Sequence, residues 1–182
     1  MAELQGKMIA ILVDNYFEQI EMTSPRDALS EAGATVHLVS TGEKRVQGMN
    51  HADMADEFEV DAVIDEMKSN DYHALVIPGG TINGDQLRVK QNAQNWIRDF
   101  NDKGKPIAVI CHGPWLLIDS GLAKGATLTS YPTLKTDLMN AGATEWKDEE
   151  VVVDGNLITS RNPDDLPAFN NALIEKLSGP ST

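Results

Sequence analysis

Apolar and polar segments follow one another along the chain in a pattern that predicts strands and helices in turn. Short apolar runs rich in β-branched residues are typical of buried strands, and they occupy Met8–Val13, Thr35–Ser40, Ala74–Ile77 and Ile107–Ile110. Longer segments with helical spacing of apolar residues lie between or after them, at Ile20–Ala32, Asp85–Asp102, the stretch after Pro114, Leu134–Asn140 and Leu166–Leu177. Polar turns are expected around Gly42 and Gly48.

The repeated strand–helix order predicts an α/β fold. Parallel strands joined by helices form a sheet that is covered on both faces, so we expect a flavodoxin-like three-layer α/β/α sandwich with a mostly parallel sheet. A further short strand is expected at Leu128–Ser130. Near the end of the chain, Glu150–Thr159 predicts an added antiparallel hairpin with Asp154-Gly155 as its turn.

Chain length supports one globular domain. The chain has 182 residues, of which 41% are hydrophobic, enough for a sizeable core over residues 1–182. The end of the chain is polar, and we expect residues 175–182 to fray.

Charge and cysteine content restrict the partners and the compartment. The chain carries 15 basic and 28 acidic residues, a net charge of −13, which disfavours nucleic acid and anionic membranes as partners. One cysteine excludes an internal disulfide and fits a reducing cytoplasm, where we expect the protein. His37, His51 and His73 lack the spacing of a zinc site, and no nucleotide-binding glycine motif occurs, so neither metal nor cofactor is expected.

The single cysteine lies where the chemistry is expected. Cys111 ends the predicted strand Ile107–Ile110, and Pro114 suits the first turn of the next helix, so the thiol stands on a tight strand-to-helix turn. Such a turn lifts a nucleophile above the carboxyl edge of a sheet, and a helix N-terminus there lowers a thiol pKa. The alternative is a structural cysteine buried in the core.

A glycine pair follows another predicted strand and ends at the same edge. Gly79 and Gly80 could expose a backbone N–H near Cys111, and the N–H of His112 points toward the same turn. Two such donors would form an oxyanion hole for a carbonyl group attacked by the thiolate. The alternative is that the two glycines only make a turn.

Several motifs together resemble the ThiJ/PfpI superfamily, and within it the PfpI branch of intracellular protease I and related stress proteins. The resemblance covers nearly the whole chain. Its motifs are Phe17-Glu18-Gln19-Ile20-Glu21, Leu75-Val76-Ile77-Pro78-Gly79-Gly80, Ala108-Val109-Ile110-Cys111-His112-Gly113-Pro114, Glu150-Val151-Val152-Val153-Asp154-Gly155 and Thr159-Ser160-Arg161-Asn162-Pro163-Asp164-Asp165-Leu166.

The resemblance implies a role for each matching residue. Cys111 matches the nucleophile, and His112 matches the histidine that acts as its acid/base partner. The amides of Gly80 and His112 match the oxyanion-hole donors. Glu21 matches a carboxyl group that hydrogen-bonds the cysteine sulfur, although Glu18, three residues earlier, could share the same helical face.

The resemblance also implies a carboxylate that reaches the histidine from a neighbouring subunit, and therefore a homodimer or larger homo-oligomer. Asp85 is the best match, but the loop Thr81–Gly84 is about one residue longer than the usual pattern, and aspartate replaces the commoner glutamate. Asp85 could instead be the N-cap of the helix that follows it. The two roles are compatible.

These residues predict a cysteine-dependent hydrolase acting on a carbonyl carbon. The same groups would serve peptide hydrolysis, or glyoxalase or deglycase action on reactive aldehydes and their protein adducts in a stress response. The alternative is a redox-sensing or chaperone-like stress protein in which Cys111 is oxidised under oxidative stress.

Overall fold

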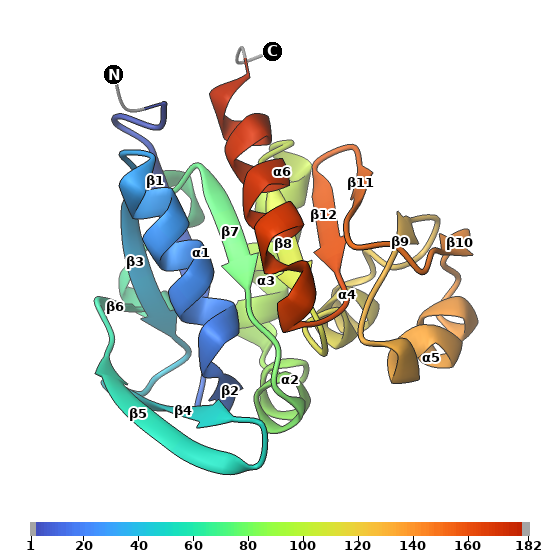
Figure 1. Ribbon diagram of the computed structural model, residues 1–182, viewed down its shortest axis with the longest axis horizontal. Helices are drawn as coiled ribbons and strands as arrows, with labels where there is room; N and C mark the ends of the chain where they lie inside the picture. Colours follow the sequence, from blue (N-terminus) through green and yellow to red (C-terminus); the bar gives the residue numbers. More distant parts are fainter. Residues whose placement is uncertain (1–2, 180–182) are drawn as a thin grey trace.

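The predicted apolar strands form the centre of a seven-stranded sheet in the computed structural model, which describes residues 3–179 (Figure 1). The strands are β1 (Met8–Leu12), β3 (Thr35–Ser40), β6 (Ala62–Val63), β7 (Ala74–Ile77), β8 (Ile107–Ile110), β11 (Val152–Asp154) and β12 (Leu157–Ser160). Their order is β11-β12-β8-β7-β1-β3-β6. All neighbours are parallel except β11 and β12, which form the expected antiparallel hairpin. The predicted fold class is confirmed.

Helices cover both faces of this sheet because its strands are apolar on both sides. On one face, α1 (Gln19–Glu31) and α6 (Leu166–Ser178) lie side by side (Figure 1). On the other face lie α3 (Gln91–Asp102) and α4 (Trp115–Ser120). Alternate strand residues divide between two cores: Ile9 and Ile11 pack with the α1/α6 side, whereas Ala10 and Leu12 pack with the α3/α4 side.

A second sheet extends from the carboxyl end of β1, and the sequence pattern did not predict it. Its strands are β2 (Phe17–Glu18), β4 (Arg45–Asn50) and β5 (Asp53–Glu59), in the order β2-β4-β5. Gly48 lies within β4, so the expectation of a polar turn there is wrong. The two long strands carry mostly exposed or half-buried residues, because they cover one edge of the molecule and have no apolar run of their own.

The predicted helical region Asp85–Asp102 divides into two helices, because the chain leaves helical geometry between them. The first, α2 (Thr81–Leu87), starts directly after Gly80, and α3 follows at Gln91. The remaining short elements are η1 (Ile64–Glu66), η2 (Ser69–Asp71), β9 (Thr127–Leu128), η3 (Pro132–Leu134), α5 (Lys135–Asn140), β10 (Glu145–Trp146) and η4 (Pro163–Asp165).

The last helix extends into the segment that was expected to fray. Helix α6 continues to Ser178, and Leu177 is buried, so the expected fraying is wrong for residues 175–178. Residues 180–182 of the expected frayed tail lie outside the described residues. Between residues 3 and 179, none of the helices has both the length and the apolar character needed to cross a membrane.

Candidate active site

A cavity of about 720 Å³ opens where the chain leaves the carboxyl ends of β1, β7 and β8. Ligand sites of α/β sheets lie at this edge. The walls come from the segment after β1, the glycine loop and α2, the cysteine turn, the β4–β5 turn and the loop after β12. The lining residues are Tyr16, Glu18, Glu21, Met49, His51, Ala52, Gly80, Thr81, Ile82, Cys111, His112, Tyr131, Asn162, Pro163 and Asp164.

The Cys111 turn is held from both sides. Its backbone has a φ of 65°, in the left-handed region that L-residues rarely adopt. The amide of Cys111 donates to the carbonyl of Ser160 at 3.1 Å, and its carbonyl accepts from the amide of Tyr131 at 2.8 Å. Gly113 is required behind the turn, because a Cβ there would lie 2.7 Å from Cγ1 of Val109.

Among residues 3–179, the non-glycine residues with a left-handed backbone conformation all lie at this cavity. The three residues concerned are Tyr16 (φ 70°), His51 (φ 56°) and Cys111 (φ 65°), and all three line the cavity. Each such residue costs about 1–3 kcal/mol and persists only where its surroundings hold it. Strain of this kind collects at functional sites, which strengthens the assignment of the cavity.

Glu21 places a buried carboxyl group beside the thiol. Its side chain is fully buried, and Oε1 accepts from the amide of Gly79 at 2.9 Å, while Oε2 has no hydrogen-bond partner among the described residues. Burial raises the pKa of Glu21 to about 8; the Gly79 amide lowers it, and the charge of Glu18 raises it. At neutral pH Glu21 is therefore largely protonated.

Glu18 points to a different partner. Its carboxylate accepts from the backbone amide of His51 at 3.2 and 3.3 Å. Oε1 of Glu21 and Cβ of Cys111 instead flank the same atom position, each 2.6 Å from where a Cβ on Gly79 would lie. Of the two glutamates left open by the sequence, Glu21 is thus the one that lies beside Cys111, and its charge raises the pKa of the thiol.

Burial also raises the pKa of the Cys111 thiol, and a charge on Glu21 raises it further. The amides of Gly80 and His112 hydrogen-bond the sulfur and lower the pKa. The expectation that this pKa is lowered is therefore wrong in direction, because burial of the thiol is the largest cause and raises the pKa. Two negative charges at this buried pair are disfavoured, so the pair retains a proton to high pH.

The His112 ring lies directly against the thiol. Its Nδ1 is 3.2 Å from Sγ of Cys111, and its Nε2 is 3.4 Å from Oγ1 of Thr81. The ring stacks on Tyr131 with centroids 4.6 Å apart and meets the edge of Trp115 at 5.2 Å. Burial lowers the pKa of His112, so the imidazole is neutral near pH 7 and can accept a proton from the sulfur.

The glycine pair is fixed by close packing. A Cβ on Gly79 would lie 2.6 Å from both Cβ of Cys111 and Oε1 of Glu21. Gly80 has a φ of 95°, and a Cβ there would lie 2.8 Å from the backbone of Tyr16 and Glu18. The pair makes the turn into α2, and the amide of Gly80 lowers the pKa of the Cys111 thiol. Its role in an oxyanion hole stays a prediction.

Asp85 is not brought to the site within one chain. It lies inside α2, which begins at Thr81, and it is exposed. The next helix, α3, has Lys90 as its N-cap, so the expectation that Asp85 caps a helix is wrong. Thr81, rather than Asp85, contacts Nε2 of His112. A contact from a neighbouring subunit stays a prediction.

Several lining residues were not found by sequence reasoning. Thr81 and Tyr131 hold the His112 ring but belong to no motif with an evident chemical pattern. His51 belongs to the unpredicted β4–β5 turn. Asn162–Asp164 offered a signal, since an Asn-Pro pair directly after a strand that neighbours β8 must lie at the same edge of the sheet.

No cluster of three or more histidine, cysteine or acidic side chains with metal-binding geometry occurs within residues 3–179.

Comparison with known proteins gives consistent matches over nearly the whole chain. The model of the DJ-1/PfpI family matches residues 7–176. Two relatives from Bacillus subtilis (strain 168) are named "Putative cysteine protease YraA" (42% identical, covering 94% of this chain and 99% of the relative) and "General stress protein 18" (41% identical, 94% and 99%).

Solved structures agree with the sequence matches. Drosophila melanogaster DJ-1beta is 30% identical with a TM-score of 0.87, covering 96% of this chain and 91% of that chain. The DJ-1/ThiJ/PfpI-like part of a two-domain protein from Anabaena variabilis, which also contains a ferritin-like domain, is 34% identical with a TM-score of 0.88. This match covers 94% of this chain and 48% of that chain.

Proposed function

This chain belongs to the DJ-1/PfpI family, and we propose that it is a cysteine-dependent hydrolase in which the Cys111 thiol attacks a carbonyl carbon. One observation carries the proposal: the Cys111 sulfur, Nδ1 of His112 and the amides of Gly80 and His112 converge in one cavity. A nucleophile, a base and two oxyanion donors are the groups that acyl transfer requires.

In the first step the thiol loses its proton to Nδ1 of His112 as the sulfur–carbon bond forms. Because burial keeps Cys111 protonated and His112 neutral, the histidine acts as a general base rather than as a partner of a preformed thiolate. The carbonyl oxygen takes the negative charge, and the amides of Gly80 and His112 stabilise it.

With a peptide, the protonated His112 then gives its proton to the leaving amine as the carbon–nitrogen bond breaks, and water hydrolyses the thioester. With a reactive aldehyde, the same attack gives a hemithioacetal, the entry to glyoxalase or deglycase action. A role in the stress response, in the cytoplasm, is part of the proposal, and it is supported by a relative named general stress protein 18.

The test compares the protein with Cys111→Ser and His112→Gln on two kinds of substrate, methylglyoxal and an unfolded fluorescent peptide. We expect many turnovers per molecule on one of them, with the rate reduced at least about 100-fold in each variant. Full activity of Cys111→Ser would overturn the proposal. Consumption of one equivalent of peroxide without any turnover would favour the redox-sensing alternative, which burial of the thiol opposes.

We also propose that the protein acts as a homodimer or larger homo-oligomer in which Asp85 of one subunit orients His112 of the next. Asp85 is exposed, and the same helix presents Ile82, whose side chain is 47% exposed at the cavity edge. Light scattering gives the mass in solution. Cys111→Ala and Asp85→Ala should regain activity when mixed, because some sites recover both groups; a fully active monomer would contradict the proposal.

A further inference from the structure

The charged groups that line the cavity are almost all acidic. Glu18 and Asp164 line it together with Glu21, which is largely protonated, and the basic groups of the lining among residues 3–179 are the imidazoles of His51 and His112. Within residues 3–179, no lysine or arginine is part of the lining. A cavity wall with this composition repels anions before they reach the sulfur.

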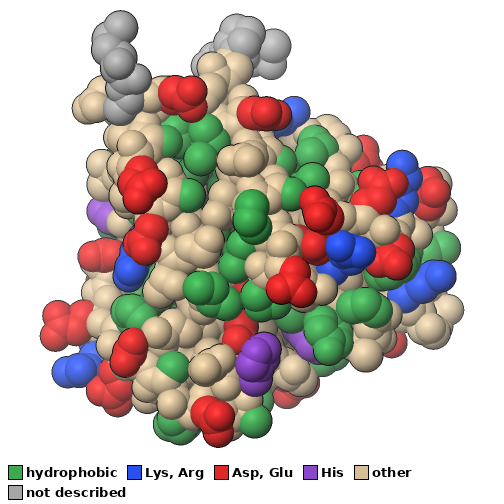
Figure 2. All heavy atoms as spheres, viewed as in Figure 1, with side chains coloured by type: hydrophobic (Ala, Val, Ile, Leu, Met, Phe, Trp, Pro, Cys, Tyr) green, Lys and Arg blue, Asp and Glu red, His purple; other side chains and the backbone are tan. Residues whose placement is uncertain are grey.

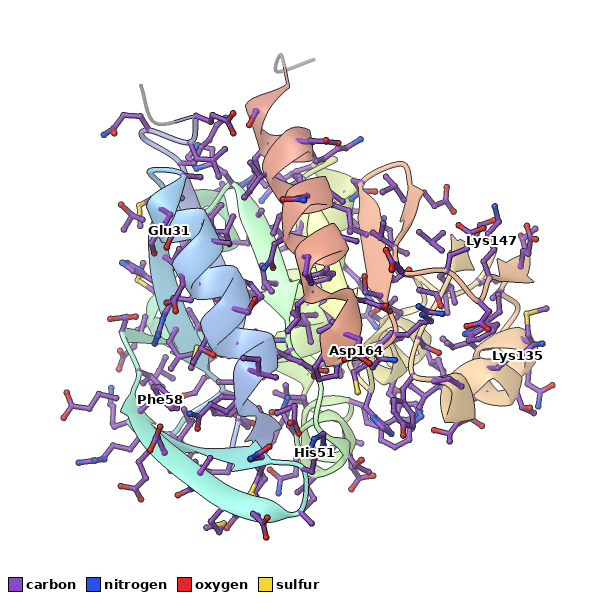
Figure 3. All side chains as sticks on the ribbon, viewed as in Figure 1. Glu31, His51, Phe58, Lys135, Lys147 and Asp164 are labelled. Carbon is purple, nitrogen blue, oxygen red and sulfur yellow. The ribbon has the colours of Figure 1, made fainter. Side chains whose placement is uncertain are left out.

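The two remaining carboxyl groups, those of Glu18 and Asp164, differ in exposure. Glu18 is nearly buried, with 11% of its side chain exposed; its carboxylate accepts from the His51 amide, and Oε1 lies 3.8 Å from Nδ1 of that ring. Asp164 is exposed and has no ion-pair partner in the described part of the chain. Figure 3 shows Asp164 at the lower end of α6 and His51 further down, at the β4–β5 turn.

The nearest arginine in sequence does not compensate these charges. Arg161 precedes the lining residue Asn162, but its guanidinium donates to Asp165 through Nε and Nη2 and to Asp148 through Nη1, each at 2.9 Å. Both partners lie outside the cavity lining. In Figure 2, which has the same viewpoint, red rather than blue side chains adjoin the purple histidines near the lower middle of this face.

The floor of the cavity has a polar group that could bind a ligand, and this group carries no positive charge. Oε2 of Glu21 is buried, lines the cavity with the rest of its side chain, and lacks a hydrogen-bond partner among the described residues. A protonated Glu21 and a neutral His112 leave no cation on the floor that could hold a carboxylate or phosphate group of a substrate.

We infer that this cavity selects carbonyl compounds that are neutral or carry a positive charge near the carbonyl, such as an ammonium or guanidinium group, and rejects those that carry a carboxylate or phosphate there. That the substrate is a carbonyl compound rests on the proposed function, whereas the selection by charge rests on Glu18 and Asp164. Coulomb attraction to these two carboxylates would favour peptides with basic residues beside the reacting bond.

The test uses charged thiol reagents, because Cys111 is the only cysteine and the reaction needs no turnover. Methanethiosulfonates carrying trimethylammonioethyl, methyl and sulfonatoethyl groups are cationic, neutral and anionic. Each forms a mixed disulfide with the sulfur and releases methanesulfinate. The quantity compared is the rate constant for the cationic reagent divided by that for the anionic reagent, with 2-mercaptoethanol as the reference thiol. At 0.15 M salt, which screens remote charges, we expect this ratio to be at least about tenfold higher for Cys111 than for 2-mercaptoethanol.

Two variants and a matched control locate the charge. Glu18→Gln and Asp164→Asn should each lower the ratio by about threefold. Glu31→Gln removes an equal charge from the far end of α1 (Figure 3), about 15 Å along the helix from Glu21, and should leave the ratio unchanged. Asp164→Asn alters an exposed side chain, so this variant remains informative if Glu18→Gln does not fold.

The outcomes separate this inference from the proposed function. A ratio equal to that of 2-mercaptoethanol, or an equal effect of all three variants, would overturn the charge selection. Turnover of methylglyoxal in preference to anionic glyoxylate, lost in Asp164→Asn, would support it with a substrate. The expected reagent ratio without turnover of any carbonyl compound would leave charge selection standing and would count against the hydrolase.

Discussion

Burial of Glu21 makes the stability of the fold depend on pH, and Glu21→Gln should remove that dependence. Glutamine has nearly the same shape, and its Oε1 can still accept from the amide of Gly79, as Oε1 of Glu21 does at 2.9 Å. It differs in that it cannot ionise. The unfolded state of the variant is therefore not stabilised by ionisation of this side chain as the pH rises.

The magnitude follows from the pKa of Glu21, about 8 in the fold against 4.5 for a free side chain. Below pH 4.5 the carboxyl is protonated in both states and has no effect. Between these values the unfolded chain loses the proton and the fold keeps it, so the free energy of unfolding falls by about 1.4 kcal/mol per pH unit. The loss reaches about 3 kcal/mol at pH 7 and about 5 kcal/mol above pH 8.

Urea denaturation of the protein and of Glu21→Gln at pH 5, 6, 7 and 8 measures this loss. From pH 5 to pH 7 we expect the free energy of unfolding of the wild type to fall by about 2.5 kcal/mol more than that of the variant. The change with pH is the readout, because a small constant offset could arise from the amide itself. Glu31→Gln, which alters an exposed glutamate of the same helix, serves as control and should run parallel to the wild type. Parallel curves for Glu21→Gln as well would refute the argument from burial.

Two further predictions concern the neighbours of the thiol. Gly79→Ala should lower the free energy of unfolding by about 1–3 kcal/mol in a thermal or urea melt and slow alkylation of Cys111, since its Cβ would lie 2.6 Å from that of Cys111. Gly42→Ala, which has open space around it, is the control and should leave the stability nearly unchanged. Equal effects of the two substitutions would contradict this packing. Tyr131→Ala should raise the pKa of His112 toward the ordinary value near 6.5, because it removes the stacked ring that helps to bury the imidazole. An NMR titration of the imidazole measures this pKa, and an unchanged value in the variant would contradict the role of stacking.

The central sheet was predictable because each of its long strands is an apolar run of its own. Three runs read from the sequence, Thr35–Ser40, Ala74–Ile77 and Ile107–Ile110, coincide with β3, β7 and β8. The Asp154-Gly155 turn likewise identified the β11–β12 hairpin, because a tight turn is a local property of the chain. The sheet β2-β4-β5 was not predictable in the same way. The β4–β5 hairpin is local, but its strands bury few side chains, and β2 pairs with β4 from a segment far away in sequence.

The site likewise has features that local sequence patterns predict and features that they do not. Cys111, His112 and Gly80 could be found because they follow apolar strands whose ends meet at one edge. That Glu21, rather than Glu18, reaches the Gly79 amide beside the thiol depends on the rotation of α1 against the end of β7, which no local pattern specifies. The direction of the thiol pKa also escaped the sequence, because a helix terminus is visible in the pattern and the extent of burial is not.

The hydrogen bond from the Cys111 amide to the Ser160 carbonyl has a consequence for the protein as it is made. Synthesis runs from the N-terminus, so β1, β3, β7 and β8 leave the ribosome before β12 does. Until residue 160 has emerged, the amide of Cys111 lacks its native acceptor, and one edge of β8 is unpaired. Asn162–Asp164, which complete the cavity wall, emerge later still. A nascent chain that stops short of this point thus carries the reactive thiol without the strand that fixes its turn.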